Sequence, residues 1–513
     1  MPQPAANAGL VNRWLQLLAC ILAMMCIANL QYAWTLFTLP LAEALHAKLS
    51  AVQLAFTLFI LAETWLVPVE GLLIDKWGAR YVVTAGGVLV GLGWVGSGHA
   101  ASLGALYSWY TVGGVGAGAV YGASVGIAVQ WFPDRRGLTT GLVAGAYGFG
   151  TALTVLPIQK MIDRSGYRSA FVTWGVLQGL AVIVAAQFLR KPPSGRRPAG
   201  AAAARSAVFQ SRVSCTPLQM VRSRAFWTMY LMMTLVAFGG LMVTAQLKPI
   251  AASNGLDKLP LWFGVSALGI ALVLDRLLNG ITRPFWGWVS DQIGRYNTMA
   301  ITFTLEAGAI FALLQFVSHP VGFVVLSGLV FFAWGNIYSL FPAAIGDVFG
   351  PEHATANYGL QYTAKGTASI FAGWGAALLV ESTGSWAPVL WVAVACDLLA
   401  AALALLWLKP LVLGLAPGKR RSEPRGLAAT PRSDPRRRRR RRPRSASRTA
   451  RGRERPGEHR AAGKRIQGVT RVAVPAATGG DWAVRGRLGA AMTGWIGLPK
   501  TAMVGRFSSS THL

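Results

Sequence analysis

The sequence predicts an all-α membrane protein of twelve transmembrane helices in two six-helix bundles, followed by a disordered C-terminal tail. Three observations lead to this prediction: the composition, the spacing of apolar stretches, and a motif that occurs twice. Of the 513 residues, 53% are hydrophobic and only 13% are charged, and the mean hydropathy is +0.44. This composition is too apolar for an ordinary soluble protein and is typical of a chain that crosses a bilayer many times.

Apolar stretches recur along the chain, and each is long enough to cross the roughly 30 Å hydrocarbon core of a bilayer as a helix. They lie at residues 14–39, 52–74, 81–103, 105–131, 138–160, 169–189, 226–248, 261–288, 297–318, 321–343, 357–380 and 386–408. The first stretch follows Arg13 and is longer than the core of a signal peptide. We therefore expect it to stay in the protein as the first transmembrane helix.

A polar segment rich in Pro, Gly, Ala and Arg separates the sixth helix from the seventh. It predicts a cytoplasmic linker over residues 190–225, between an N-terminal bundle (12–189) and a C-terminal bundle (226–410). Basic residues gather in the even-numbered loops. By the positive-inside rule, these loops and both termini are expected on the cytoplasmic side of a bacterial-type inner membrane.

The tail, residues 411–513, differs from the rest of the chain. It holds 25 basic and 5 acidic residues, so it supplies +20 of the formal net charge of +30. Seven consecutive arginines run from Arg436 to Arg442. Self-repulsion and low apolar content predict disorder. Such a run could contact anionic lipid headgroups or nucleic acid, but we favour an extension without function and expect no specific nucleic-acid partner.

A GxxxDxxG motif follows the second helix of each predicted half. One copy holds Gly71, Asp75, Gly78 and Arg80, and the other holds Gly287, Asp291, Gly294 and Arg295. The offset of 216 residues that carries Asp75 onto Asp291 also carries Pro68 onto Pro284, which indicates an internal repeat. The glycines permit a tight turn, the aspartates can cap a helix, and the basic residues anchor the cytoplasmic face. We therefore expect a structural or gating role for Asp75, Arg80, Asp291 and Arg295.

Two basic residues inside apolar helices predict the binding site. Arg283 lies eight residues before Asp291 and Lys365 eight residues after Asn357, so each lies about 12 Å from the cytoplasmic helix end. A cation at that depth costs about 2.5 to 3.5 kcal/mol and is expected to face a cavity or a partner. Two such cations without a neighbouring carboxylate would repel each other, whereas a small dianion between them would neutralise both. The guanidinium would grip one carboxylate in a bidentate fork, and the ammonium would bind the other as a point charge.

Several stretches resemble the major facilitator superfamily over roughly residues 12 to 410 and, within it, the oxalate:formate antiporter family. They are QYAWT from Gln31, VYGASVG around Tyr121, WFPDRRG from Trp131, TRPFWGWVSD from Thr282, FFAWGNIYSLFP from Phe331 and YTAKGTASIFAG from Tyr362. The resemblance implies alternating access and a central anion site formed by one Arg on helix 8 and one Lys on helix 11, here Arg283 and Lys365. It implies exchange of oxalate for formate by a protein that we expect to be a monomer.

Aromatic side chains within the apolar helices are expected to form the walls of this site. In the resembling family, matching positions enclose the small substrate. The residues concerned here are Gln31, Tyr32, Tyr121, Tyr147, Trp334, Tyr338 and Tyr362. Buried Tyr and Trp need a hydrogen-bond partner for their polar atom, although packing between helices is an equally good interpretation of any single ring.

Acidic residues within the helices leave other functions open. A membrane carboxylate can relay protons, so a proton-coupled carboxylate symporter that uses Glu63 is the alternative mechanism. Asp275 and Arg276 are adjacent and are interpreted as a structural or gating pair. A transporter-like sensor would share the same binding residues. We expect neither an enzyme nor a cofactor or metal site, because the sequence shows no Ser, His and Asp arrangement, nucleotide loop or metal-ligand cluster.

Overall fold

The computed structural model describes residues 12–132, 136–190, 192, 214–350 and 353–414, and all structural statements below concern these residues. The chain divides into two compact units, residues 1–425 and 426–513. The second unit consists of residues outside the described part of the chain. The predicted disorder of the tail concerns these same residues. The helical part extends slightly further than predicted, because its last helix ends at Gly414.

The first half of the chain folds into helices that run back and forth across the predicted bilayer. They are α1 (Arg13–Tyr32), α2 (Trp34–Ala44), α3 (Leu49–Trp65), α4 (Val67–Trp77), α5 (Ala79–Gly98), α6 (Leu103–Trp131), α7 (Arg136–Phe149), η1 (Gly150–Leu153) and α8 (Val155–Phe188). Short breaks at Ala33 and Leu66 divide the first two predicted spans into α1–α2 and α3–α4. In α8, Gly166 has a φ of 80°, and the chain reverses there between the fifth and sixth spans.

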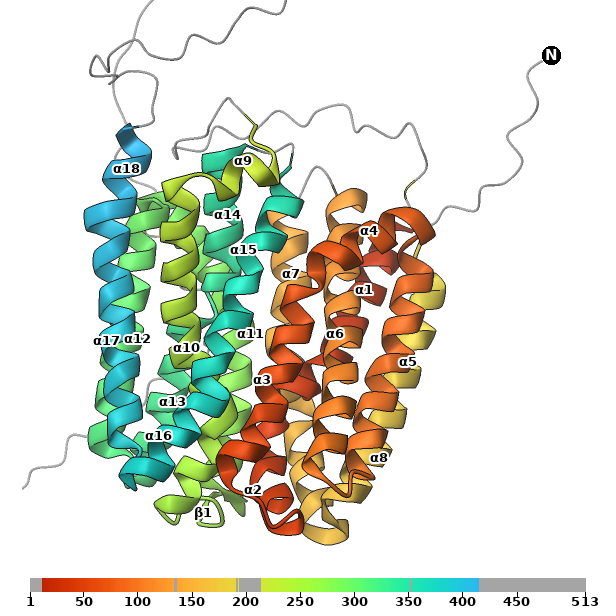
Figure 1. Cartoon of the computed structure of the whole chain (residues 1–513), viewed down its shortest axis with the longest axis vertical. Helices are drawn as coiled ribbons and strands as arrows, with labels where there is room; N and C mark the ends of the chain where they lie inside the picture. Colours follow the sequence, from red (N-terminus) through yellow and green to blue (C-terminus); the bar gives the residue numbers. More distant parts are fainter. Residues whose placement is uncertain (1–11, 133–135, 191, 193–213, 351–352, 415–513) are drawn as a thin grey trace, which may run out of the picture. The chain divides into compact units, whose positions relative to one another are not determined.

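The second half repeats this arrangement. It contains α9 (Pro217–Val221), α10 (Arg224–Ser253), β1 (Pro260–Trp262), β2 (Val265–Ser266), α11 (Ala267–Ile293), α12 (Arg295–Phe316), α13 (Pro320–Trp334), α14 (Ile337–Phe349), α15 (Ala354–Ser369), η2 (Ile370–Gly375), α16 (Ala376–Thr383), α17 (Ala387–Ala402), η3 (Leu403–Leu408) and α18 (Lys409–Gly414). Figure 1 shows the two halves side by side, the first in red to yellow and the second in green to blue.

One predicted helix boundary is wrong. The eighth span was expected to begin at Leu261, but residues 260–266 form the antiparallel pair β1–β2, and the helix begins at Ala267. Phe263 and Gly264 at the turn have φ values of 55° and 70°, which a helix does not allow. The apolar residues just before Ala267 therefore form a short hairpin and not the first turns of the helix.

Eight helical stretches among the described residues are long and apolar enough to span a membrane. The predicted spans that do not meet this criterion are α3–α4, α11 and α15–α16. The first and third are divided into short helices, and α11 carries several charged residues. These same spans hold Glu63, Arg283 and Lys365. The three spans that do not meet this criterion thus carry the buried charges of the centre.

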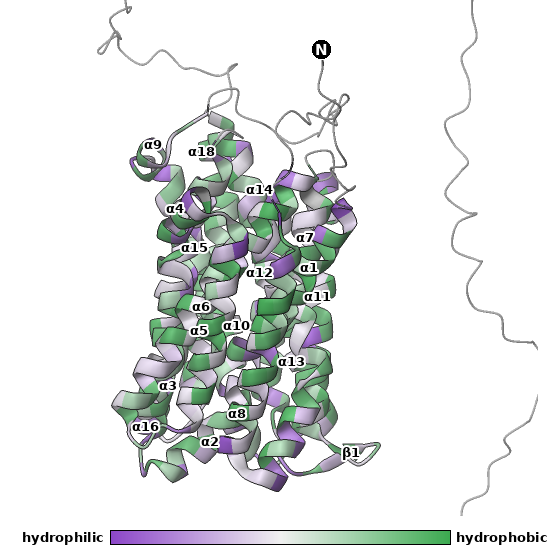
Figure 2. Cartoon of the chain, turned by 90° about the vertical axis from the view of Figure 1, so that its right-hand side faces the viewer, coloured by the Kyte–Doolittle hydropathy of each residue, from purple (hydrophilic) through white to green (hydrophobic). Residues whose placement is uncertain are grey.

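The outer surface of the bundles suits a lipid environment. Large apolar side chains such as Leu18, Leu180 and Leu406 are more than half exposed. Hydrophobic residues cover much of the middle of the helices, and hydrophilic residues are more frequent toward the ends (Figure 2). Such a surface would be unfavourable in water and is favourable against acyl chains.

The repeated motif has the same backbone geometry in both halves. Gly78 has φ 88° and ψ 151°, and Gly294 has φ 91° and ψ 150°. Each glycine ends one helix and begins the next. Only glycine adopts such angles without strain, which explains why this residue stands at both positions.

Candidate functional site

The predicted binding residues lie together in one buried cluster between the two halves. None of them is more than 6% exposed. They are Gln31 and Tyr32 of α1, Tyr121 of α6, Tyr147 of α7, Arg283 of α11, Trp334 of α13, Tyr338 of α14, and Tyr362 and Lys365 of α15. Arg283 and Lys365, whose depth along the helix was argued from the sequence, and the residues expected from the family resemblance are thus all buried in this conformation.

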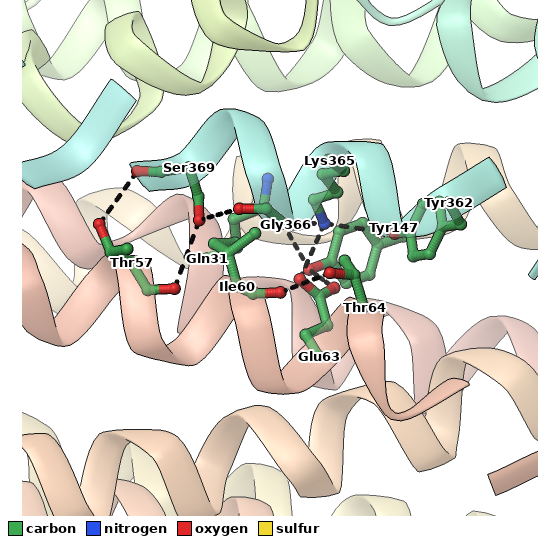
Figure 3. Close-up of polar contacts among 10 residues, drawn as sticks. All are labelled: Gln31, Thr57, Ile60, Glu63, Thr64, Tyr147, Tyr362, Lys365, Gly366 and Ser369. Atoms are coloured by element: carbon green, nitrogen blue, oxygen red, sulfur yellow. Dashed lines mark hydrogen bonds and ion pairs between the residues drawn. The ribbon is translucent and has the colours of Figure 1, made fainter. Parts of the chain in front are cut away.

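Lys365 is held by three oxygen atoms from three helices. Its Nζ lies 2.8 Å from Oε2 of Glu63, and it donates hydrogen bonds to Oε1 of Gln31 at 2.7 Å and to the Tyr362 hydroxyl at 3.2 Å. The Tyr147 hydroxyl donates to the other Glu63 oxygen at 2.8 Å and lies 2.9 Å from Oε1 of Gln31. Figure 3 shows these side chains converging between α3 and α15.

The expectation that no carboxylate neighbours the two cations is wrong for Lys365. Glu63 is fully buried and forms an ion pair with it. The pairing is physically reasonable, because a buried ammonium without a counter-charge would cost several kcal/mol. From the sequence alone, Glu63 is expected only as a candidate for proton coupling. Its place as the counter-ion of Lys365 was not predicted.

Arg283 has a different environment. It is 1% exposed, and no carboxylate in the described part of the chain forms an ion pair with it within 4.0 Å. Its guanidinium donates to the Ala144 carbonyl and lies 3.5 Å from the Asn279 side-chain oxygen, while the carbon atom at its centre is 4.6 Å from the centroid of the Tyr338 ring. Arg283 is thus a buried cation whose charge is balanced by dipoles and a ring face rather than by an acid.

Aromatic rings join the two cations into one site. The Tyr338 ring lies next to both, because Lys365 Nζ is 5.9 Å from its centroid. Tyr121 stacks on Tyr362 with centroids 5.2 Å apart and meets Tyr147 edge-on at 5.5 Å. These rings exclude water, which strengthens every electrostatic interaction inside the cluster.

Several donors in this cluster have no hydrogen-bond partner among the described residues. They are Gln31 Nε2, Arg283 Nε, Trp334 Nε1 and the Tyr338 hydroxyl. Buried polar groups are nearly always paired, and an unpaired one costs about 1 to 3 kcal/mol. Unpaired donors in the same cluster as a guanidinium without an acid in ion-pair contact fit a ligand that accepts hydrogen bonds and carries negative charge.

The residues of the repeated motif lie away from this cluster. Arg295 forms ion pairs with Asp291 at 2.6 Å and Asp347 of α14 at 3.1 Å. Arg80 donates to the Gln187 side chain of α8. These contacts join neighbouring helices, as a structural or gating role requires. The side chain of Asp75 lies outside the described part of the structure, so its predicted role is untested.

Asp275 and Arg276 do not pair as expected. Both are fully buried, but their charged atoms form no hydrogen bond with each other or with another described residue at normal bonding geometry. Two further acids, Glu306 and Asp397, are fully buried in the second half near Gly239. Among the described residues, no group of three or more His, Cys, Asp or Glu side chains could hold a metal ion.

Contacts near the β1–β2 end join the two halves, and no sequence motif predicts them. Glu381 of α16 accepts hydrogen bonds from the backbone N–H and the hydroxyl of Ser50, both at 2.8 Å. Gln53 of α3 donates to Gln246 of α10 at 2.9 Å. Lys248 donates to the Leu36 carbonyl at 2.9 Å. These contacts hold this end of the two halves together in the present conformation.

Several known proteins and solved structures are similar to this chain. The Major Facilitator Superfamily model matches residues 19–280 and 263–454. The oxalate:formate antiporter of Oxalobacter formigenes is 37% identical over 376 residues, which cover 72% of this chain and 86% of that protein. Monocarboxylate transporter 14 of Homo sapiens is 28% identical over 204 residues, 38% of each protein. The crystal structure of a D-xylose-proton symporter has a TM-score of 0.62 at 14% identity and covers 76% of this chain and 97% of that one, a likeness of fold alone.

Proposed function

Because the chain belongs to the major facilitator superfamily, and within it to the oxalate:formate antiporter family, we propose that it exchanges small carboxylates across the membrane, with oxalate and formate as the leading pair. The chain is a multi-pass membrane transporter and not an enzyme. We further propose that it lies in a bacterial-type inner membrane as a monomer, with both termini in the cytoplasm.

The observation that carries the substrate proposal is the state of Arg283. Its charge is buried without an acid in ion-pair contact, and it lies against the Tyr338 ring in a cluster where donors of Gln31, Trp334 and Tyr338 are also unpaired. A carboxylate is planar and matches the fork of the guanidinium. Bound there, it would supply both the missing charge and the missing acceptors, at the level where the two halves meet.

Lys365 would bind the second carboxylate of a dianion. Glu63 is its counter-ion while no substrate is bound. The substrate carboxylate would replace Glu63 at the ammonium, which keeps the buried Lys365 neutralised throughout the cycle. This exchange of counter-ions explains how the site can hold a cation and still accept an anion. The enclosing rings, Tyr121, Tyr147 and Tyr362, would exclude larger molecules.

Purified protein in liposomes loaded with labelled oxalate tests this proposal. External oxalate or formate should drive the label out, whereas chloride should not. The variants Arg283→Gln and Lys365→Gln should insert normally and lose the exchange. Wild-type vesicles that release no label to any small carboxylate would refute the proposed function.

A second mechanism has one observation in its favour. Glu63 contacts Lys365 directly, so loss of the pair on anion binding would leave a buried carboxylate that can take up a proton. The chain would then be a proton-coupled carboxylate symporter. In that case an imposed proton gradient should drive accumulation of labelled carboxylate in vesicles that contain no internal carboxylate.

A further inference from the structure

Arg276 is a buried cation that the proposed mechanism does not use. It is fully buried in α11, and none of its three guanidinium nitrogens has a hydrogen-bond partner among the described residues. The guanidinium lies between two rings, 4.4 Å from the centroid of Tyr32 and 4.2 Å from that of Phe331. Its neighbour Asp275 interacts with it electrostatically and faces Ser327 of α13, but the Asp275 oxygens form no hydrogen bond with Arg276.

The two rings leave the guanidinium ready for a planar anion. Rings stabilise a cation through its faces, and the N–H groups point outward along its edges. A desolvated Arg with all its N–H groups unpaired is among the most costly arrangements in a protein interior. A carboxylate in the plane of the guanidinium would accept two of these hydrogen bonds and supply the acceptors that Asp275 does not.

The position of Arg276 places it next to the central cluster. It lies seven residues before Arg283 on α11, about two turns or 10.5 Å along the helix toward the β1–β2 end. Tyr32 stands between: its ring covers Arg276 on one side and packs against Tyr147 of the cluster at 5.4 Å on the other. An anion that moves between this end and Lys365 has to pass the Tyr32 side chain.

We propose that Arg276 forms a second anion subsite, where a substrate carboxylate binds on the far side of Tyr32 before it reaches Arg283 and Lys365. This inference rests on the proposed function. It assigns Tyr32 as the partition between an outer and an inner subsite. The ligand class is the small carboxylates that the transporter exchanges.

Kinetics of labelled oxalate exchange in liposomes test the subsite. Loss of one charge-assisted contact is worth about tenfold or more in affinity. Arg276→Gln should therefore raise KM at least tenfold for carboxylate added at the β1–β2 face, with kcat within about twofold of wild type. Arg276→Lys keeps the charge but not the fork, and it should raise KM less. The control Arg168→Gln removes an exposed positive charge near the same end and should leave KM unchanged.

The outcomes separate this inference from the proposed function. An unchanged KM in Arg276→Gln beside an inactive Arg283→Gln would overturn the subsite alone. So would a lower kcat at unchanged KM, because a residue that binds the carboxylate before translocation has to change KM. If Arg276→Gln does not fold, the KM of Arg276→Lys tests the subsite instead. A wild-type KM in that variant overturns the subsite. Wild-type vesicles that exchange no carboxylate would refute both proposals.

Discussion

At the scale of single residues, Glu63 determines which cations of the site are neutralised. In this conformation it neutralises Lys365, while Arg283 and Arg276 have no acid in hydrogen-bond contact. An arriving dianion thus meets two kinds of cation: one that must release its partner, and others that are already free. The balance between Glu63 and the substrate at Lys365 decides how tightly an anion binds.

Replacing Glu63 by Gln should destabilise the protein and strengthen its response to oxalate. The change leaves a buried ammonium unpaired, which costs about 3 to 5 kcal/mol when one partner of a buried pair is removed. Bound oxalate would restore the neutralisation. Thermal unfolding in detergent should show a lower Tm than wild type without oxalate and a larger rise in Tm when oxalate is added.

The matched control is Glu43→Gln, which removes an exposed acid from α2. Its Tm and its response to oxalate should equal those of wild type. If Glu63→Gln also has the Tm and the oxalate response of wild type, the ion pair does not stabilise the protein in solution. The counter-ion exchange proposed above would then be wrong.

At the scale of elements, two glycines maintain the repeat. Gly78 and Gly294 share nearly identical backbone angles because each joins two consecutive spans by the same abrupt turn. The turn orients Arg295 toward Asp347 and Arg80 toward Gln187. A side chain at either glycine would strain the turn and weaken the contacts that follow it.

Gly294→Ala should lower the free energy of unfolding by about 1 to 3 kcal/mol, since its φ of 91° is open only to glycine without strain. Gly78→Ala should have an effect of similar size. The control Gly308→Ala lies inside α12, where an added Cβ meets no atom within 4 Å, and should be neutral or slightly stabilising. Thermal unfolding measures all three. Equal Tm values for Gly294→Ala and Gly308→Ala would contradict the argument.

The sequence predicted the spans, Arg283 and Lys365 from physical reasons, whereas Gln31 and the aromatic members of the cluster followed from the family resemblance. Charges inside apolar helices are costly, so their depth along the helix locates them. The ion pair between Lys365 and Glu63 could not be predicted this way, because the two residues are 302 positions apart and lie in different halves. The breaks at Ala33 and Leu66 also left no periodic signal, because residues on both sides of each break are apolar.

At the scale of the whole molecule, the charge carried per cycle tests the mechanism. Exchange of an oxalate dianion for a formate monoanion moves one net negative charge, and a potential of 100 mV acts on it with about 2.3 kcal/mol. An inside-negative potential should therefore slow oxalate entry into formate-loaded vesicles. A rate independent of the potential would instead indicate that a proton travels with the dianion. If Glu63 carries that proton, Glu63→Gln should make the rate of oxalate entry depend on the potential again.

The tail should contribute nothing to transport. It begins beyond the last described helix, which ends at Gly414, and the compact unit that holds the site ends at Arg425. A chain truncated after Pro417 should therefore insert and exchange labelled oxalate at the wild-type rate. Loss of exchange in truncated protein that is folded and inserted would assign the arginine-rich tail a role in the cycle.

Alternating access requires the contacts at the β1–β2 end to break in each cycle. Glu381 binds the N-terminus of α3 through Ser50, where its charge is also favoured by the helix dipole. A contact of this kind contributes about 0.5 to 2 kcal/mol, equivalent to a change of roughly 2- to 30-fold in the ratio of closed to open molecules. Removing it should favour the state open at this end.

Glu381→Gln should therefore increase the reaction of a cysteine placed at Tyr121, in the buried central cluster, with a membrane-impermeant thiol reagent added at this face. The background would be a protein without its four native cysteines. The control Glu43→Gln removes an acid at the same end that forms no such bond to α3, and it should not change the reaction rate. Equal rates in both variants would show that Glu381 does not hold the halves closed, and the closure would then have to depend on Gln53, Gln246 and Lys248.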